Sequence, residues 1–360
     1  MVPYFILFAI PAWFALGGAA KRAEASHPTK TPWSLIVVLY ALAIGLRHEV
    51  GGDWFNYIEN LTEIDSLDFS AVLSSRIGDP AYRILGWVSS PLGGIYFVNL
   101  ICGTLFAIGL LRFCINQPAP WLALTVAAPY LVTVVAMGYT RQGVAIGITM
   151  LGLVSLSKEK IFRFFIWIFV AAAFHKSAII LIPMAIFSRG RKFAGSIFGV
   201  ALMGPIIFML FLQESVDNLI TGYVDDGMES SGAFVRVMMN ALPAGLYLIW
   251  RRKFNLSRAD RSFWTWMCIG AIVFIPALAV SPSSTAVDRI ALYFIPVQIF
   301  VWSRLHQAVS LGPRSERLIR QSIVSYSLLV LVVWLFFGVN SYAWLPYKFY
   351  PWEMLLSALS

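Results

Sequence analysis

The amino-acid sequence predicts an all-α, polytopic integral membrane protein. Charged residues make up 12% of the 360 positions and apolar residues 59%, whereas a soluble domain carries about 25% charged residues. Apolar stretches of about 20 residues, the length that crosses the hydrocarbon core, recur along the whole chain. Lys and Arg cluster between alternate stretches, as they do in the cytoplasmic loops of membrane proteins. These observations exclude a soluble enzyme with a single membrane anchor.

Twelve membrane spans are predicted from these apolar stretches. They cover residues 2–20, 33–46, 93–112, 120–137, 140–156, 161–174, 177–188, 194–212, 234–250, 262–280, 288–303 and 321–338. The second, sixth and seventh are short, which local thinning of the bilayer or burial against neighbouring helices accommodates. Lys21 and Arg22 follow the first span instead of preceding it, which indicates a retained span and not a cleaved signal peptide.

One polytopic membrane domain is therefore expected over residues 1–360, with two loops on the extracytoplasmic side. The longer loop, 47–92, contains Trp54-Phe55-Asn56-Tyr57-Ile58, which resembles an amphipathic helix lying in the headgroup region. The second loop, 213–233, contains the adjacent pair Asp225 and Asp226. Their spacing does not suit shared metal coordination, so this segment is interpreted as solvated.

The charge distribution sets the predicted orientation. Nineteen of the 27 Lys and Arg residues fall in inner loops with only four of the 18 Asp and Glu residues, and the other charged residues fall on the outer face. This satisfies the positive-inside rule and places both termini outside. Because topology explains the net charge of +9, no nucleic-acid partner is predicted.

The sequence predicts neither a metal nor a cofactor. Cys102, Cys114 and Cys268 lie within or at the ends of apolar spans, and an odd count without paired spacing indicates neither a disulfide framework nor a metal site. H-E-x-x-H, P-loop and G-x-S-x-G motifs are absent from the sequence.

The first candidate site follows the second span, at Arg47-His48-Glu49-Val50-Gly51-Gly52-Asp53-Trp54. Gly51 and Gly52 permit a tight turn before Asp53. A structural interpretation stays open, with Asp53 as an N-cap, Arg47 extended toward the interface, and Trp54 and Tyr57 as interfacial anchors. The same loop holds Asp79-Pro80-Ala81-Tyr82-Arg83 just before the chain re-enters the membrane.

The second candidate site is the very short hairpin Met137-Gly138-Tyr139-Thr140-Arg141-Gln142-Gly143. An arginine at this depth is costly unless it faces a watered cavity or an anion, and its planar fork suits phosphate oxygens. Extension of Arg141 to the interface is the structural alternative.

Two further outer segments carry ionisable groups. His175 and Lys176 share a tight hairpin, where His175 is either a structural residue or a proton acceptor. Asp288 and Arg289 open the eleventh span in this reading. Asp288 then suits a cap, whereas Arg289 opposes the helix macrodipole in the absence of an anionic ligand.

Together, these segments resemble the EpsG family, relatives of the Wzy polymerases of bacterial O-antigen and exopolysaccharide synthesis. The resemblance rests on elements that run in order through nearly the whole chain: Arg47 with Gly52-Asp53-Trp54 and Tyr57, Asp79-Pro80-Ala81-Tyr82, Thr140-Arg141-Gln142, Phe174-His175-Lys176-Ser177-Ala178, Asp288-Arg289 with Tyr293, and Leu345-Pro346-Tyr347-Lys348. It implies a GT-C-like fold in the bacterial cytoplasmic (inner) membrane. The implied reaction is metal-independent and joins oligosaccharide repeats carried on undecaprenyl diphosphate at the outer leaflet.

The resemblance also implies roles for particular residues. Asp53 is expected to be the catalytic base, with His175 as the second candidate. The expected substrate-binding residues are Arg47, Tyr57, Asp79, Arg141, Gln142, Lys176, Asp288 and Arg289, of which the cations would hold the diphosphate. Expected partners are the lipid-linked oligosaccharides, the lipid bilayer, and chain-length regulator and export proteins.

Three alternative functions stay open at this stage. A ligase would transfer the finished chain to a different acceptor. A flippase or other transporter of lipid-linked oligosaccharides predicts ionisable residues deep within spans, whereas here they lie at outer helix ends. A membrane O-acyltransferase would need a histidine reachable from the inner face, and His175 is predicted outside.

Overall fold

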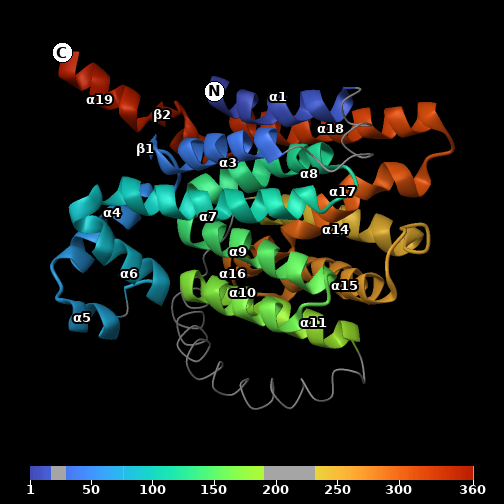
Figure 1. Cartoon of the computed structure of the whole chain (residues 1–360), viewed down its shortest axis with the longest axis horizontal. Coiled ribbons are helices and arrows are strands. Elements are labelled where there is room, and N and C mark those ends of the chain that lie inside the picture. The colour runs from blue at the N-terminus through green and yellow to red at the C-terminus, as the bar shows by residue number, and fades with distance from the viewer. Residues whose placement is uncertain (18–29, 76, 190–231, 360) are drawn as a thin grey trace. The chain divides into compact units, whose positions relative to one another are not determined.

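The computed structural model describes residues 1–17, 30–75, 77–189 and 232–359, and these residues are predominantly helical (Figure 1). The predicted span 194–212 and almost all of the predicted loop 213–233 lie outside the described residues. The chain divides into two compact units: Met1–His175 with Gly312–Ser360, and Lys176–Leu311. Each unit is described by itself below.

The first unit contains most of the helices. They are α1 (Val2–Leu16), α3 (Lys30–Gly45), α4 (Trp54–Asp65), α5 (Phe69–Ser74), α6 (Pro80–Ser89), the 3-10 turn η1 (Ser90–Leu92), α7 (Ile95–Ile115), α8 (Pro120–Ala127), the π-helical segment η2 (Ala128–Ala136), α9 (Thr140–Ser157), α10 (Ile161–Phe174), α18 (Pro313–Phe337), the 3-10 turn η8 (Ser341–Trp344) and α19 (Tyr350–Leu359). Helix α7 packs against α3 and α9, α10 packs against α9, and α1 packs against α8 and α18 (Figure 1). Two short strands, β1 (Arg47–His48) and β2 (Lys348–Phe349), pair antiparallel.

Small residues allow α7 and α9 to approach closely. A Cβ atom added at Gly109 of α7 would lie 1.9 Å from the carbonyl oxygen of Gly147 in α9. A Cβ atom added at Gly147 would lie 2.5 Å from the Cα atom of Phe106 in α7. Such contacts are typical of membrane helices, which associate through close backbone packing. They hold the middle of α9 against α7.

The second unit is built around α14. Its elements are the 3-10 turn η3 (Lys176–Ile180), α11 (Leu181–Arg189), α14 (Ala233–Trp250), α15 (Arg258–Val280), α16 (Ser284–Ala291), the 3-10 turn η7 (Leu292–Phe294) and α17 (Ile295–Val309). Helix α14 packs against α15 and α17, and α11 packs against α15. Asn240 Nδ2 donates to the carbonyl oxygen of Ala291 at 2.9 Å, and Gln298 Nε2 donates to Asn240 Oδ1 at 2.7 Å. These bonds satisfy buried amides where the apolar helices meet.

The helices support the predicted membrane protein class. Among the described residues, five helices are long and apolar enough to cross a membrane: Ile95–Ile115, Ala233–Trp250, Arg258–Val280, Ser284–Val309 and Pro313–Phe337. Shorter apolar helices cover Val2–Leu16, Trp33–Gly45, Pro120–Ala136, Ile161–Phe174 and Lys176–Ser188. The all-α prediction is confirmed, whereas the number of twelve spans and the GT-C-like arrangement stay predictions.

The predicted loop 47–92 is largely helical. It contains α4, α5 and α6, and α4 buries Trp54, Tyr57 and Ile64 while it exposes Phe55 and Glu63. Helix α5 begins at an N-cap, where Asp68 Oδ1 accepts from the backbone N–H of Ala71 at 3.0 Å. Helices therefore make up much of this segment, and its amphipathic, extracytoplasmic position at the membrane surface stays a prediction.

The contact between α7 and α9 can be tested with one added methyl group. Gly109→Ala should destabilise the protein by about 1–3 kcal/mol, because the helices must separate to make room for it. Gly245→Ala in α14 is the matched control, since nothing lies within 4 Å of its added Cβ, and it should be neutral or stabilising by up to about 1 kcal/mol. Thermal unfolding of the full chain in detergent micelles measures both. Equal stability of the two variants would contradict this packing.

Candidate functional site

Arg47 is buried at the end of α3, with only 1% of the residue exposed. Its Nε atom donates to the carbonyl oxygen of Val50 at 3.0 Å, and Nη1 donates to the carbonyl oxygen of Ile44. Its Nη2 atom donates to Thr140 Oγ1 at 2.7 Å and to Asn99 Oδ1 at 3.4 Å. A buried charge needs this kind of compensation. Arg47 therefore joins α3, α7 and the beginning of α9.

Arg141 lies in the first turn of α9 and pairs with Asp79. Its Nη1 atom lies 3.3 Å from Asp79 Oδ2, and 32% of the Arg141 side chain is exposed. Its guanidinium carbon lies 6.0 Å from the ring centroids of both Tyr57 and Tyr82, which is within the range of a cation–π interaction. A partly exposed guanidinium that is held by a carboxylate and two rings is preorganised to receive an anion.

Asp79 is available to Arg141 because it does not cap its own helix. It occupies the N-cap position of α6, and its side chain makes no capping hydrogen bond there. Gly78 precedes it with φ +69°, and a Cβ atom at Gly78 would lie 3.1 Å from Arg141 Nη1. A glycine at this position therefore avoids strain in the turn and leaves room for the guanidinium.

Gly51 fits the first loop against the hairpin that precedes α9. It has φ +110°, and a Cβ atom there would lie 2.3 Å from the carbonyl oxygen of Met137. Its N–H donates to the carbonyl oxygen of Ala343 at 2.8 Å. The turn predicted at Gly51 is therefore a three-way contact between residues that are distant in sequence.

A segment near the C-terminus of the chain covers this hairpin. Trp344 is 1% exposed, and its Nε1 donates to the carbonyl oxygen of Thr133 in η2 at 2.7 Å. Its ring fills the space beside Gly138, where an added Cβ atom would lie 2.3 Å from Trp344 Cζ2. The pairing of β1 with β2 continues this contact, with Arg47 opposite Phe349. We refer to residues 341–350 as the C-terminal strap.

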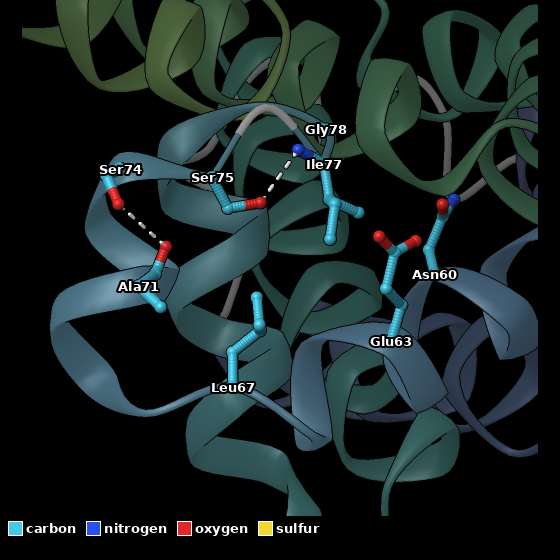
Figure 2. Close-up of a pocket in the computed structure, with 8 residues that line it drawn as sticks. All are labelled: Asn60, Glu63, Leu67, Ala71, Ser74, Ser75, Ile77 and Gly78. Atoms are coloured by element: carbon cyan, nitrogen blue, oxygen red, sulfur yellow. Dashed lines mark hydrogen bonds between the residues drawn. The ribbon is translucent and has the colours of Figure 1, made fainter.

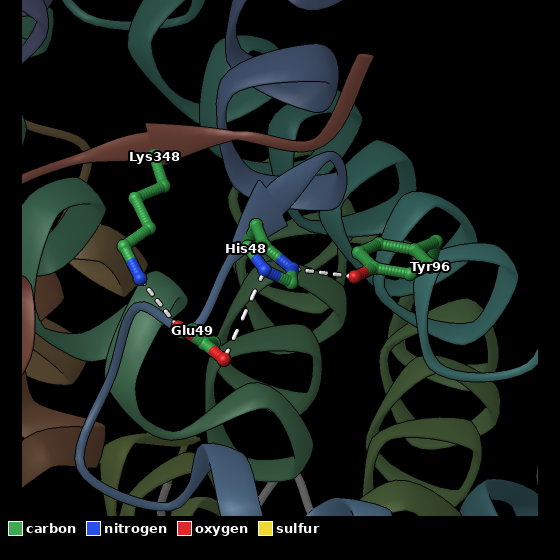
Figure 3. A network of polar contacts seen from close by, with 4 residues as sticks. All are labelled: His48, Glu49, Tyr96 and Lys348. Atoms are coloured by element: carbon green, nitrogen blue, oxygen red, sulfur yellow. Dashed lines mark hydrogen bonds and ion pairs between the residues drawn. The ribbon is translucent and has the colours of Figure 1, made fainter. Parts of the chain in front are cut away.

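Polar and aromatic side chains tie the strap to the first loop (Figure 3). His48 Nδ1 and Tyr96 Oη are hydrogen-bonded at 2.6 Å. The ring of Tyr96 also stacks on Tyr350 of the strap, with centroids 3.6 Å apart. Lys348 Nζ is hydrogen-bonded to the carboxylate of Glu49, and this bond lowers the pKa of the Glu49 carboxyl below its usual value. The strap therefore fixes the loop that leads to Asp53.

Among the described residues, buried polar atoms without a hydrogen-bond partner include the hydroxyl oxygen of Tyr82, beside Arg141, and Nδ2 of Asn99, beside Arg47. The Nε atom of the buried Arg83 is a third. Asn99 Oδ1 also accepts from Thr140 Oγ1 at 3.1 Å, so its amide is oriented by Thr140 and Arg47. Unsatisfied buried polar groups are rare in folded proteins and are candidates for contact with a ligand.

The structure locates the predicted proton acceptors without testing their role. Asp53 is half-buried and occupies the N-cap position of α4, as the structural interpretation expected, but its side chain makes no capping hydrogen bond there. His175 is half-buried and follows the last residue of α10. Gln142 is buried in the first turn of α9, next to Arg141. The catalytic and binding roles of these residues stay predictions.

The second unit requires a correction to the expected positions of Asp288 and Arg289. Helix α16 begins at Ser284 with Ser283 as its cap, so Asp288 lies inside the helix and Arg289 lies in its last turn. Because the chain stays helical from Ser284 to Val309, Arg289 lies beyond the first turn, and the predicted conflict with the helix start was wrong. Asp288 is buried and pairs with Arg236 at 2.8 Å. Lys176 is half-buried in η3.

Several residues of the site were not assigned a role from the sequence. The sequence could have indicated a functional role for Asn99, because it is a polar residue within an apolar span. Thr140 and Tyr82 stood inside recognised motifs, but nothing in those motifs indicated a contact with Arg47 or Arg141. Trp344 and Tyr350 had no local signal, because their contacts join segments more than 200 positions apart.

The fold and the site define a polytopic helical membrane protein with a partly exposed arginine held among acidic and aromatic side chains at helix ends. The chain belongs to the EpsG family, whose model matches residues 30–349. The family fits a membrane protein of polysaccharide biosynthesis with a polymerase-type or glycosyltransferase-like role. No curated protein and no solved structure matches the chain.

The contribution of the C-terminal strap can be measured at its buried tryptophan. Trp344→Ala should destabilise the protein by about 3–5 kcal/mol, because it removes a fully buried ring beside the hairpin. Trp352→Ala in α19 is the matched control, since Trp352 is 58% exposed, and it should change stability by less than about 0.5 kcal/mol. Thermal unfolding in detergent micelles measures both variants. Unchanged stability of Trp344→Ala would show that the strap does not support the hairpin.

Proposed function

We propose that this protein is a glycosyltransferase that polymerises undecaprenyl-diphosphate-linked oligosaccharide repeat units at the outer face of the bacterial cytoplasmic membrane. In this reaction a hydroxyl oxygen of one lipid-linked repeat attacks the anomeric carbon of the growing chain. The bond between that carbon and the lipid diphosphate breaks, and the diphosphate leaves with the electron pair. The hydroxyl proton passes to a base on the protein.

The observation that carries this proposal is the environment of Arg141. A leaving diphosphate develops negative charge, and preorganised donors stabilise such charge best where water is partly excluded. Arg141 offers five N–H donors, and it is held by Asp79 and by the rings of Tyr57 and Tyr82 while part of its surface stays accessible. The guanidinium can therefore receive phosphate oxygens without first having to be oriented.

Arg47 and Arg141 have different roles in this proposal. Arg47 directs its donors to four protein acceptors and is almost fully buried. It is therefore a positioning residue that holds the first loop beside α9, and Arg141 makes the contact with the diphosphate. Tyr82 and Asn99 offer buried polar atoms close to these cations for further substrate contacts.

Asp53 is the proposed base. It lies in the loop that Arg47, Gly51 and the strap hold in place. The next residue is Trp54, and the guanidinium carbon of Arg47 lies 5.7 Å from the centroid of the Trp54 ring. His175 is the second candidate. The substrate-binding roles of Lys176, Asp288 and Arg289, the extracytoplasmic position of both termini, and partnership with chain-length regulator and export proteins belong to the same proposal.

The proposal is tested by supplying the purified full chain with lipid-linked repeats. Wild type should produce a ladder of longer lipid-linked chains. Asp53→Asn should slow the reaction about 10²–10⁴-fold through loss of the base. Arg141→Ala should slow it about 10²–10³-fold through loss of charge stabilisation. Glu59→Gln, at an exposed acid of α4, is the control and should leave the rate unchanged.

The outcomes separate the proposal from its rivals. Absence of a ladder with wild type contradicts polymerisation, and transfer of one chain to a different acceptor would indicate a ligase. Ladders that form at the same rate in Asp53→Asn and Arg141→Ala would contradict the assigned site while leaving the function in place.

A further inference from the structure

A cavity lies beside Arg141, between α4, α5 and the turn before α6 (Figure 2). Its volume is about 630 Å³, within the range of roughly 300–1,000 Å³ that small-ligand sites occupy. It is lined by Asn60, Glu63, Leu67, Ala71, Ser74, Ser75, Ile77 and Gly78. We refer to it as the α4–α5 groove. Gly78 joins the groove to the candidate site, because an added Cβ atom at this glycine would lie 3.1 Å from Arg141 Nη1.

The side chains of Asn60 and Glu63 are available to a ligand. They lie one turn apart on α4, and Figure 2 shows the Glu63 carboxylate directed into the groove with the Asn60 amide beside it. In the part of the chain that the structure describes, neither side chain has an intramolecular hydrogen bond or ion pair. A carboxylate accepts hydrogen bonds, and an amide both accepts and donates them.

The opposite wall adds hydroxyl groups. Ser74 Oγ donates to the carbonyl oxygens of Ser70 and Ala71 at 3.2 Å, which leaves its lone pairs to accept. Ser75 Oγ accepts from the backbone N–H of Ile77 at 3.1 Å, which leaves its proton to donate. Sugar hydroxyls act as both donor and acceptor, so this mixture of groups suits a polyhydroxyl ligand. An acyl chain would leave these polar groups unsatisfied.

The charge of the groove selects among such ligands. The segment 54–83, which supplies all of the lining, contains five acidic residues and two arginines, Arg76 and Arg83, and is therefore net acidic. The Arg83 guanidinium is directed to the carbonyl oxygens of Ser75 and Leu73. Like charges disfavour an anionic ligand in the groove itself. The Arg141 guanidinium at its Gly78 end favours an anion there. The two features together suit a molecule with an uncharged polyhydroxyl part and an anionic end.

We infer that the α4–α5 groove is a saccharide-binding subsite that takes neutral sugars of the lipid-linked oligosaccharide, namely those next to the diphosphate. This inference rests on the proposed function, because the diphosphate at Arg141 determines which sugars reach the groove. Glu63 and Asn60 recognise sugar hydroxyls, and the acidic surroundings exclude a uronic acid from this subsite. The groove thus determines the specificity for the first sugars of the chain.

Binding of free saccharides tests the subsite without any requirement for polymerisation. The detergent-solubilised full chain is applied to an array of short neutral oligosaccharides, each with a counterpart in which one sugar is a uronic acid. Wild type should bind neutral members and bind their uronic counterparts at least about tenfold more weakly. Glu63→Gln should weaken binding about tenfold or more, since hydrogen bonds to a charged group are the strong ones. Glu59→Gln on the same helix is the matched control.

A second pair of variants blocks the groove by size. Ala71→Trp fills the groove and should abolish binding, whereas Leu73→Trp places the same ring at an exposed position of α5 that does not line it. A thermal unfolding midpoint of Ala71→Trp equal to that of Leu73→Trp establishes that the groove variant is folded. If Ala71→Trp is unfolded, Ala71→Leu replaces it in the same comparison.

Failure of the inference and failure of the proposed function give different results. The inference is wrong if no neutral oligosaccharide binds to wild type, if the groove variants bind as their controls do, or if uronic and neutral members bind equally. Saccharide binding that depends on the groove, combined with no ladder from lipid-linked repeats, would retain the subsite and contradict the polymerase.

Discussion

The buried guanidinium of Arg47 is the constraint on which the rest of the site depends. A charge in apolar surroundings is tolerated only when its donors are satisfied, and Arg47 finds acceptors at the end of α3, in the following loop, on α7 and on α9. Those four segments must therefore meet at one point. Their meeting places the loop that carries Asp53 beside the helix that carries Arg141. The close packing of α7 on α9 and the ring of Trp344 support the same junction.

Arg47 and Arg141, which were both expected at the outer interface, thus differ in physical role. Arg47 is buried and stabilises the junction. Arg141 contacts Asp79, Tyr57 and Tyr82, and part of its side chain stays exposed. The α4–α5 groove lies beside Arg141, and its polar lining consists of the Glu63 carboxylate, the Asn60 amide and two serine hydroxyls. A lipid diphosphate with neutral sugars is complementary to this arrangement, because its anionic end meets the guanidinium and its uncharged part meets the acidic groove. This correspondence links the proposed reaction to the proposed subsite.

Much of the helical architecture was predictable because hydropathy and breaker residues act locally. The predicted span 161–174 has the same bounds as α10, and the short hairpin before Thr140 was expected from the sequence. The pairing of Arg141 with Asp79 and the strap around Trp344 were not predictable, because they depend on contacts between segments far apart in the chain. Arg289 was misplaced for a different reason: Ser283 caps α16 and starts it earlier than hydropathy indicated, which places Arg289 beyond the first turn.

The claim that Arg47 holds the junction is tested most directly by a double-mutant cycle with Thr140, whose hydroxyl accepts from Arg47 Nη2 at 2.7 Å. The free energy of unfolding in detergent micelles is measured for wild type, Arg47→Met, Thr140→Val and the double variant. If the buried bond supports the junction, the double variant should lose less stability than the sum of the two single losses, with a coupling energy of at least about 1 kcal/mol. Additive losses, within about 0.3–0.5 kcal/mol, would contradict this role.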